Sequence, residues 1–241
     1  MTRIGLITIG QAPRDDIVSE IRQFLPPDVE ILQAGALDGL TLREIFLHLP
    51  KSEERTLVTR LVNGKEVIVD KEFIYERIKN IIHSLEKKVE LLGLLCSGSF
   101  PRLSSRVPLI LPYLLLEGFL VALSLPGPIG IVVPSPKQIV PVAQKLRNLG
   151  IPAIGAAVSP YTEGHRVVET ARSLVDQGAA AIVLHCFGYP LWTRNQVQLA
   201  TGRPVILVRS LFARALAELV QDDRKARSLE DHISSIKPMS G

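Results

Sequence analysis

The chain has 241 residues with a net charge of +4, and 46% of them are hydrophobic, so it can bury a large core and fits one domain or two small lobes. We expect a cytoplasmic protein without a membrane partner, because no run of about 18 apolar residues occurs and the first residues lack the order of a signal peptide. The small net charge and the 5% of aromatic residues argue against a nucleic-acid partner.

In the first half of the chain, apolar strands alternate with amphipathic helices. We expect strands at residues 3–9, 29–32 and 89–95, and helices at residues 15–25, 41–49 and 71–87. Two further short strands, residues 57–61 and 66–69, flank Asn63-Gly64. This dipeptide predicts a tight hairpin turn in which both central residues have positive φ.

The second half repeats this alternation after an apolar segment at residues 109–125. We expect strands at residues 129–133, 153–158, 180–184 and 205–208, and helices at residues 137–149, 165–176, 195–199 and 211–220. The charged tail beyond Asp222 is expected to be loosely held. Because strands alternate with helices throughout, the chain predicts an α/β fold with parallel sheets flanked by helices and joined by right-handed crossovers.

Each half contains one cysteine that follows an apolar strand, with a glycine two residues later. The two segments are LLGLLCSGS, residues 91–99, and AAIVLHCFG, residues 180–188. Ligands of parallel sheets bind beyond the carboxyl ends of the strands, so two pseudo-symmetric lobes that meet at a cleft would place Cys96 and Cys186 opposite one another. Two cysteines are too few for a secreted disulfide framework, and we expect reduced thiols.

Paired thiols suit proton transfer at a carbon next to a carboxylate. One thiolate would remove a proton from one face while the other thiol delivers a proton to the opposite face, which is racemisation or epimerisation without a cofactor. Backbone N–H groups after each cysteine would bind the carboxylate and stabilise the enolate-like charge. These turns comprise Ser97, Gly98, Ser99, Phe187 and Gly188. His185 is expected to point to the opposite face of its strand and not to act as the base.

A packing role for the cysteines is the alternative, because a cysteine that ends an apolar strand usually lies in the core. The chain would then be an unrelated α/β protein with core thiols. The equivalent contexts of Cys96 and Cys186 favour a functional role. We expect no metal ion and no cofactor, because the sequence has no Cys/His metal-site spacing and neither glycine-rich phosphate-binding pattern.

Three polar side chains near the first sheet are further candidates for substrate binding. Gln11 and Arg14 lie between the first strand and the first helix, where they could reach polar groups of a substrate. A helix start with a solvated Arg14 explains the same residues. Arg102 could neutralise a carboxylate near Cys96, although a loop arginine is more often solvated.

Loop residues after two strands of the second lobe form another candidate group. Ser135 and Gln138 follow the strand that ends at Val133, and Ser159, Tyr161 and Thr162 follow the strand that ends at Val158. We expect these side chains at the ligand-binding edge of the sheet. Ordinary helix capping explains Ser135 and Thr162 equally well.

Two segments resemble the aspartate/glutamate racemase superfamily. Residues 185–191 read His-Cys-Phe-Gly-Tyr-Pro-Leu and match the Gly-Cys-Thr-His-Tyr-Pro-Leu motif of glutamate racemases at Cys, Tyr, Pro and Leu. Ser97-Gly98-Ser99 is similar to their Cys-Asn-Thr-Ala motif only in the small polar residues after the cysteine. More closely, the opening IGLITIGQAPRDD and the order of elements over nearly the full length resemble the AroM family, a branch of that superfamily.

This resemblance implies a cofactor-independent racemase or isomerase with Cys96 and Cys186 as catalytic acid and base and a small carboxylate as substrate. It also implies two lobes with a cleft between them. The first would comprise residues 1–102 plus 210–241, and the second residues 103–209.

Two assisting groups of the racemases are replaced in this chain. Gly10-Gln11 stands where they have Asp-Ser, and Gly188 stands where they have a histidine. An amino acid is therefore not favoured over another carboxylate, because superfamily relatives also isomerise maleate, racemise hydantoins and decarboxylate arylmalonates.

A protein that binds a carboxylate or regulates another process on the same scaffold, without turnover, is the rival interpretation. Thiol reactivity separates the two, because an active enzyme needs at least one cysteine with a lowered pKa. A homodimer is compatible with the apolar segment at residues 109–125, and a buried helix explains that segment as well.

Overall fold

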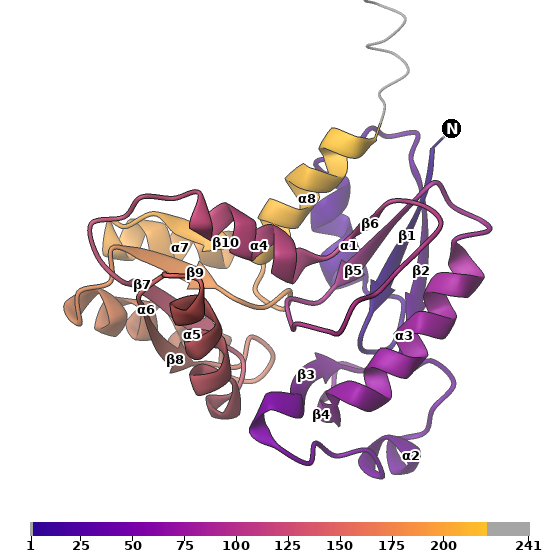
Figure 1. The fold of residues 1–241 in the computed structure, drawn as a ribbon, viewed down its shortest axis with the longest axis horizontal. Coiled ribbons are helices and arrows are strands. Elements are labelled where there is room, and N and C mark those ends of the chain that lie inside the picture. Colours follow the sequence, from indigo (N-terminus) through magenta and orange to yellow (C-terminus); the bar gives the residue numbers. More distant parts are fainter. Residues whose placement is uncertain (1, 221–241) are drawn as a thin grey trace, which may run out of the picture.

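The computed structural model describes residues 2–220 and contains two four-stranded parallel sheets (Figure 1). The first sheet has the order β2-β1-β5-β6, and its strands are β1 (Arg3–Thr8), β2 (Glu30–Gly35), β5 (Leu91–Leu95) and β6 (Leu109–Ile110). The second has the order β10-β9-β7-β8, and its strands are β7 (Ile129–Val133), β8 (Ala153–Ala157), β9 (Ala181–Leu184) and β10 (Val205–Leu207). The expected α/β architecture with two parallel sheets is confirmed.

Eight helices cover the sheets within the described residues. They are α1 (Asp15–Arg22), α2 (Leu42–Phe46), α3 (Lys71–Leu85), α4 (Pro112–Val121), α5 (Ile139–Asn148), α6 (Val167–Asp176), α7 (Leu191–Thr201) and α8 (Val208–Leu219). Three single 3₁₀ turns are η1 (Glu53–Arg55), η2 (Pro136–Gln138) and η3 (Gly164–Arg166). None of the helices within residues 2–220 has the length and apolarity needed to cross a membrane. The expected loose tail lies outside the described residues.

The helices form where apolar residues recur on one face and a cap satisfies the first N–H groups. In α3, Ile74, Ile78 and Ile82 are buried at intervals of four residues and pack against the first sheet. The side chain of Asp70 accepts hydrogen bonds from the backbone N–H of Glu72 and Phe73, which fixes the start of α3. This start matters for the site, because it positions Lys71.

The two sheets share one core. The largest cluster of buried side chains combines β1 with β7 and β9 of the second sheet, and it is completed by α1, α4 and α8. Phe212 of α8 contacts Phe187 edge-on at 5.4 Å between ring centroids. Figure 1 shows α4 and α8 crossing between the sheets. The last described helix therefore packs against side chains from both sheets.

The expected lobe boundary at residue 102 lies between two neighbouring strands of the first sheet. β6 pairs in parallel with β5, and residues 96–108 connect these two strands. How the chain divides between the lobes remains a prediction.

An antiparallel hairpin of β3 (Thr56–Arg60) and β4 (Glu66–Asp70) extends from the first lobe. The predicted tight turn, which needs positive φ at both Asn63 and Gly64, is wrong. Gly64 has a φ of 88°, but no non-glycine residue within the described chain, Asn63 included, has positive φ. The N–H of Leu61 donates to the carbonyl of Lys65 and closes a wider loop. In Figure 1 the hairpin lies between α3 and α5, beside the second lobe.

Candidate active site

Both cysteines follow internal strands of their sheets. Cys96 comes directly after β5, and Cys186 lies two residues after the end of β9. Their side chains are 7% and 8% exposed. They belong to different core clusters, one in each lobe.

Each thiol has the same local hydrogen bond. The backbone N–H of Gly98 donates to Cys96 Sγ at 3.3 Å, and the N–H of Gly188 donates to Cys186 Sγ at 3.3 Å. Such a donor favours the thiolate over the thiol. The similar segments around Cys96 and Cys186 therefore give the two sulfur atoms the same hydrogen bond from the backbone N–H two residues later.

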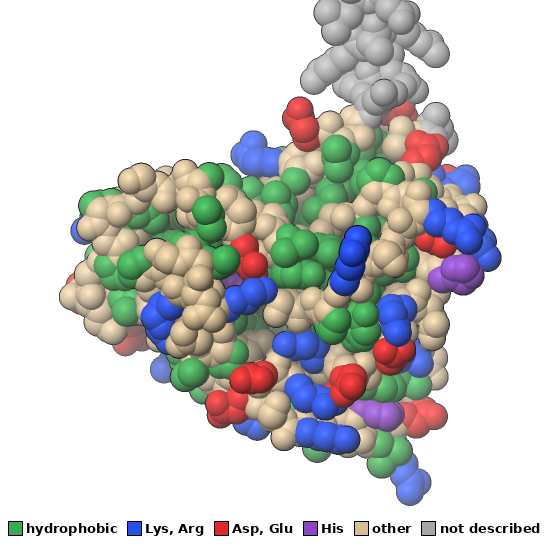
Figure 2. Space-filling view, in the orientation of Figure 1, with side chains coloured by type: hydrophobic (Ala, Val, Ile, Leu, Met, Phe, Trp, Pro, Cys, Tyr) green, Lys and Arg blue, Asp and Glu red, His purple; other side chains and the backbone are tan. Residues whose placement is uncertain are grey.

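The two thiols line one cavity of about 100 Å³. Five of the other expected binding residues line it as well: Arg14, Ser97, Gly98, Ser99 and Phe187. The charge of Cys186 acts on Cys96 and raises its pKa. On the visible face in Figure 2 the molecule is hollowed between the two lobes, and side chains of both charges stand at the rim.

Burial controls the ionisation of the thiols. It raises the pKa of Cys96 to about 12, and the Gly98 N–H and the Lys71 ammonium oppose the rise only in part. Burial also raises the pKa of Cys186, against the opposing effects of the Gly188 N–H, two arginines and a tyrosine. Both groups are therefore thiols at neutral pH in this arrangement.

His185 lies in the cavity, contrary to expectation. The prediction was wrong because β9 ends at Leu184, so the alternation of a strand no longer applies at residue 185. Burial lowers the pKa of His185 to about 4, and its imidazole is neutral at pH 7. Its Nδ1 lies 3.4 Å from Ser97 Oγ.

Two of the three cations that line the cavity are held by carboxylates. Arg14 donates to both carboxylate oxygens of Asp16, at 2.9 and 2.8 Å. Lys145 Nζ lies 2.6 Å from a carboxylate oxygen of Glu117. The third, Lys71, has no carboxylate oxygen within 4.0 Å in the described part of the chain, and burial lowers its pKa.

Several expected binding residues do not line the cavity. Gln11 donates to the carbonyls of Leu37 and Leu40, which fixes a loop instead. Ser135 caps the start of η2 without a side-chain hydrogen bond. Gly188 reaches the site only through its N–H.

Ser159 and Arg102 are likewise placed elsewhere. Ser159 Oγ donates to the carboxylate of Glu66 on the hairpin and accepts from the N–H groups of Tyr161 and Thr162. Arg102 lies at a separate surface depression. The sequence placed these residues in the correct loops, but it did not show where their hydrogen bonds would go.

The hairpin forms a wall of the cavity that the sequence did not predict. Its residues Thr56, Leu57, Val58 and Thr59 line the cavity. Gln138 Nε2 donates to the carbonyl of Thr56 at 3.1 Å, so with the Ser159–Glu66 bond two hydrogen bonds join the hairpin to the second lobe. Lys71, Tyr113, Glu117, Lys145 and Tyr161 are further lining residues outside the expected binding set, of which only Tyr161 was considered a candidate.

The chain is thus an α/β protein with two parallel sheets, each of which has an internal strand followed by a cysteine at a shared cavity. The family model described as AroM protein matches residues 4–220, so the chain belongs to the AroM family. Among curated proteins, none matches the sequence.

Solved structures of racemases and isomerases share the fold. Allantoin racemase from Klebsiella pneumoniae superposes with a TM-score of 0.61 at 18% identity, over 91% of this chain and 87% of that one. Glutamate racemase from Aquifex pyrophilus gives 0.54 at 17% identity, over 91% and 84%. The maleate isomerase variant C200A from Pseudomonas putida S16, with maleate, gives 0.57 at 14% identity, over 89% and 90%. At such identities the likeness establishes the fold.

Proposed function

We propose that this chain is a cofactor-independent racemase or isomerase that moves a proton at the carbon next to a carboxylate, with Cys96 and Cys186 as acid and base. The observation that carries the proposal is the position of both thiols on one cavity, each with a glycine N–H on its sulfur. Thiols from different sheets can take a proton from one face of a carbon and return one to the other.

Lys71 is the group that we assign to the substrate carboxylate. Arg14 and Lys145 already have carboxylate partners, whereas Lys71 has none among residues 2–220. Burial lowers the pKa of Lys71 because it disfavours the ammonium form. A bound carboxylate would raise this pKa again and pair with the ammonium. Lys71 is also close enough to Cys96 for their charges to interact, so a carboxylate there would bring its neighbouring carbon towards the sulfur.

The test is proton NMR of the protein in D₂O with a panel of small amino, hydroxy and dicarboxylic acids. We expect deuterium to replace the hydrogen next to the carboxylate of at least one acid. We expect Lys71→Gln to weaken binding of that acid by about tenfold or more, while the matched change Lys87→Gln at an exposed helix end leaves it unchanged. Absence of exchange across the panel would contradict the proposal.

The raised pKa values of both thiols favour one rival, a protein that binds a carboxylate without turnover. With a pKa of about 12, the Cys96 thiolate costs about 7 kcal/mol at pH 7. Ligand-induced shifts in the protein spectrum without any exchange would support this rival. Exchange that disappears when either cysteine is removed would exclude it.

A further inference from the structure

We propose that the two thiols have different roles in the reaction: Cys186 loses its proton more easily and becomes the proton-accepting thiolate, Cys96 remains the proton-donating thiol, and Tyr161 with Arg14 creates this difference. This inference rests on the proposed proton-transfer function. It concerns residues that the racemase motifs do not contain.

Few groups stabilise a charge on Cys96. Its sulfur accepts one hydrogen bond, from the N–H of Gly98. The Lys71 ammonium is the one cation within the described residues that favours its thiolate, and the charge of Cys186 acts against it. The surrounding cluster is apolar and includes Leu57 and Phe100. Proton loss from Cys96 is therefore opposed by burial on nearly all sides.

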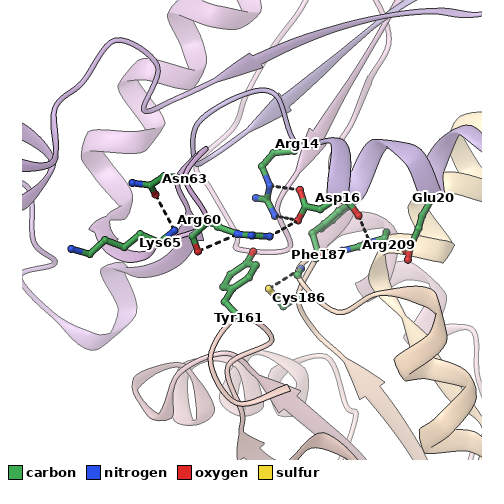
Figure 3. Close-up of polar contacts among 12 residues, drawn as sticks. Arg14, Asp16, Glu20, Arg60, Asn63, Lys65, Tyr161, Cys186, Phe187 and Arg209 are labelled. Atoms are coloured by element: carbon green, nitrogen blue, oxygen red, sulfur yellow. Dashed lines mark hydrogen bonds and ion pairs between the residues drawn. The ribbon is translucent and has the colours of Figure 1, made fainter. Parts of the chain in front are cut away.

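More groups stabilise a charge on Cys186. In addition to the Gly188 N–H, the hydroxyl of Tyr161 and the guanidinium groups of Arg14 and Arg209 favour the thiolate of Cys186 and oppose the rise of its pKa. Figure 3 shows Tyr161 between Cys186 and the Arg14–Asp16 pair. A hydroxyl donates more strongly to a thiolate than to a thiol, so this contact favours ionisation.

Tyr161 is itself fixed beside Cys186. The Arg14 guanidinium carbon lies 5.8 Å from the centre of the Tyr161 ring, and the arginine charge lowers the pKa of the phenol against the effect of burial. Arg14 is only 3% exposed and its orientation is set by two hydrogen bonds to Asp16. A buried cation thus lies beside the phenol, and Tyr161 and Cys186 both line the cavity.

Glycine at position 188 makes room for this tyrosine. A Cβ atom at residue 188 would lie 2.8 Å from Cζ of Tyr161 and would also collide with Pro160. Position 188 is where the racemase motif has a histidine. In this chain the space beside Gly188 is occupied by Tyr161, which brings a hydroxyl group from a different loop.

The turn after Cys186 is anchored by a second arginine. Arg209 of α8 donates from Nε to the carbonyl of Phe187 at 2.8 Å and pairs with Glu20 of α1. The carboxylate of Glu20 also accepts from the N–H of Leu191 at the start of α7. The ionisable groups that act on Cys186 are therefore Arg14, Arg209 and Tyr161, and the two arginines pair with Asp16 and Glu20. The charge of Cys186 in turn acts on Cys96, Tyr161 and Tyr189.

The proton balance of the reaction is simple. The Cys186 thiolate forms an S–H bond as the C–H bond of the substrate breaks, and the electron pair delocalises onto the carboxylate. The S–H bond of Cys96 then breaks as a C–H bond forms on the opposite face. The protein ends with a Cys96 thiolate and a Cys186 thiol, and proton exchange with water restores the Cys96 thiol and the Cys186 thiolate for the next turnover.

The test is the pH dependence of alkylation by iodoacetamide, resolved for each cysteine by peptide mass spectrometry. The pH at half-maximal rate reports ionisation independently of how easily the reagent enters. We expect Cys186 to react at a lower pH than Cys96. Tyr161→Phe should move the Cys186 profile up by about one pH unit, a roughly tenfold rate loss below the midpoint, and leave Cys96 unchanged.

Tyr113→Phe is the matched control, because Tyr113 also lines the cavity but its hydroxyl donates to the carbonyl of Phe100. It should leave Cys186 unchanged. If Tyr161→Phe does not fold, the absorbance of the thiolate is measured against pH in the two single-cysteine variants. The thiol of Cys186 in Cys96→Ser should ionise at a lower pH than the thiol of Cys96 in Cys186→Ser. Earlier reaction of Cys96, or a Cys186 profile unaffected by Tyr161→Phe, would overturn the inference. No substrate is needed, so this result is separate from the exchange experiment.

Discussion

Ser97 Oγ donates a hydrogen bond of 2.6 Å to the backbone carbonyl of His185. Ser97, which follows Cys96, is thereby bonded to His185, which precedes Cys186. The bond joins loops from two different sheets across the cavity, and it fixes the relative positions of the two thiols.

Removal of this bond should loosen the site. Ser97→Ala leaves the His185 carbonyl without its side-chain donor, and we expect a loss of about 1 kcal/mol in the free energy of unfolding by urea. Ser99→Ala is the matched control, because Ser99 lines the same cavity and its hydroxyl makes no side-chain hydrogen bond among residues 2–220. Equal losses in the two variants would mean that the cross-lobe bond has no special effect.

Two glycines should respond to alanine in opposite directions. Gly188→Ala forces Tyr161 and Pro160 apart, and we expect it to destabilise the fold by about 1–3 kcal/mol. Gly118 lies within α4 with no atom within 4 Å of an added Cβ, so Gly118→Ala should stabilise the fold by about 0.5–1 kcal/mol. Thermal unfolding measures both changes, and a neutral Gly188→Ala would show that the space beside Cys186 is not filled as described.

His185 should give the protein a specific acid sensitivity. Its pKa is lowered from 6.5 to about 4 by burial, so the unfolded chain binds this proton more tightly than the folded one. Stability is therefore full above pH 6.5 and declines as the pH falls to 4, by about 2–3 kcal/mol. Urea unfolding between pH 7 and 4 should show this decline in the wild type.

His185→Gln should remove that decline, while His165→Gln at an exposed position should retain it. The carboxylates with lowered pKa values, Asp16, Asp70, Glu44 and Glu86, also lose stabilisation at the acid end of this window, but they do so in every variant, so the difference between the two histidine variants reports His185. An unchanged pH profile in His185→Gln would show that the imidazole is not the group responsible.

The hairpin should open more easily when its link to the second lobe is cut. Gln138→Ala removes the donor to the Thr56 carbonyl, and we expect faster amide hydrogen exchange across residues 56–70 by about tenfold. Lys137→Ala changes the neighbouring exposed residue and should leave exchange unchanged. If neither variant accelerates exchange, the Gln138 contact does not hold this wall of the cavity.

The strands and the two thiols could be predicted from the sequence because their signals are local. An apolar run that ends in Cys96 or Cys186 is visible within nine residues, and parallel pairing then brings the strand ends to one edge. The equivalent glycine N–H bonds follow from the same short segments.

The remaining parts of the site depend on tertiary contacts. The sequence predicted a hairpin, but its packing over the cavity depends on Gln138 and Ser159 from the other lobe. Gln11 was placed in the correct loop, yet its amide is used by Leu37 and Leu40. Which partner a polar side chain binds depends on which groups lie near it in the folded chain, and this cannot be read from the sequence around that side chain.

The central claim is that two thiols from different lobes act on one substrate carbon. The most direct measurement is the rate at which a single enantiomer of the exchanging acid is converted to its mirror image by wild type, Cys96→Ser and Cys186→Ser, followed by chiral chromatography. We predict conversion by the wild type and a loss of at least about a thousandfold in each variant, with both variants folded. Conversion at near wild-type rate by either single-cysteine variant would contradict the account.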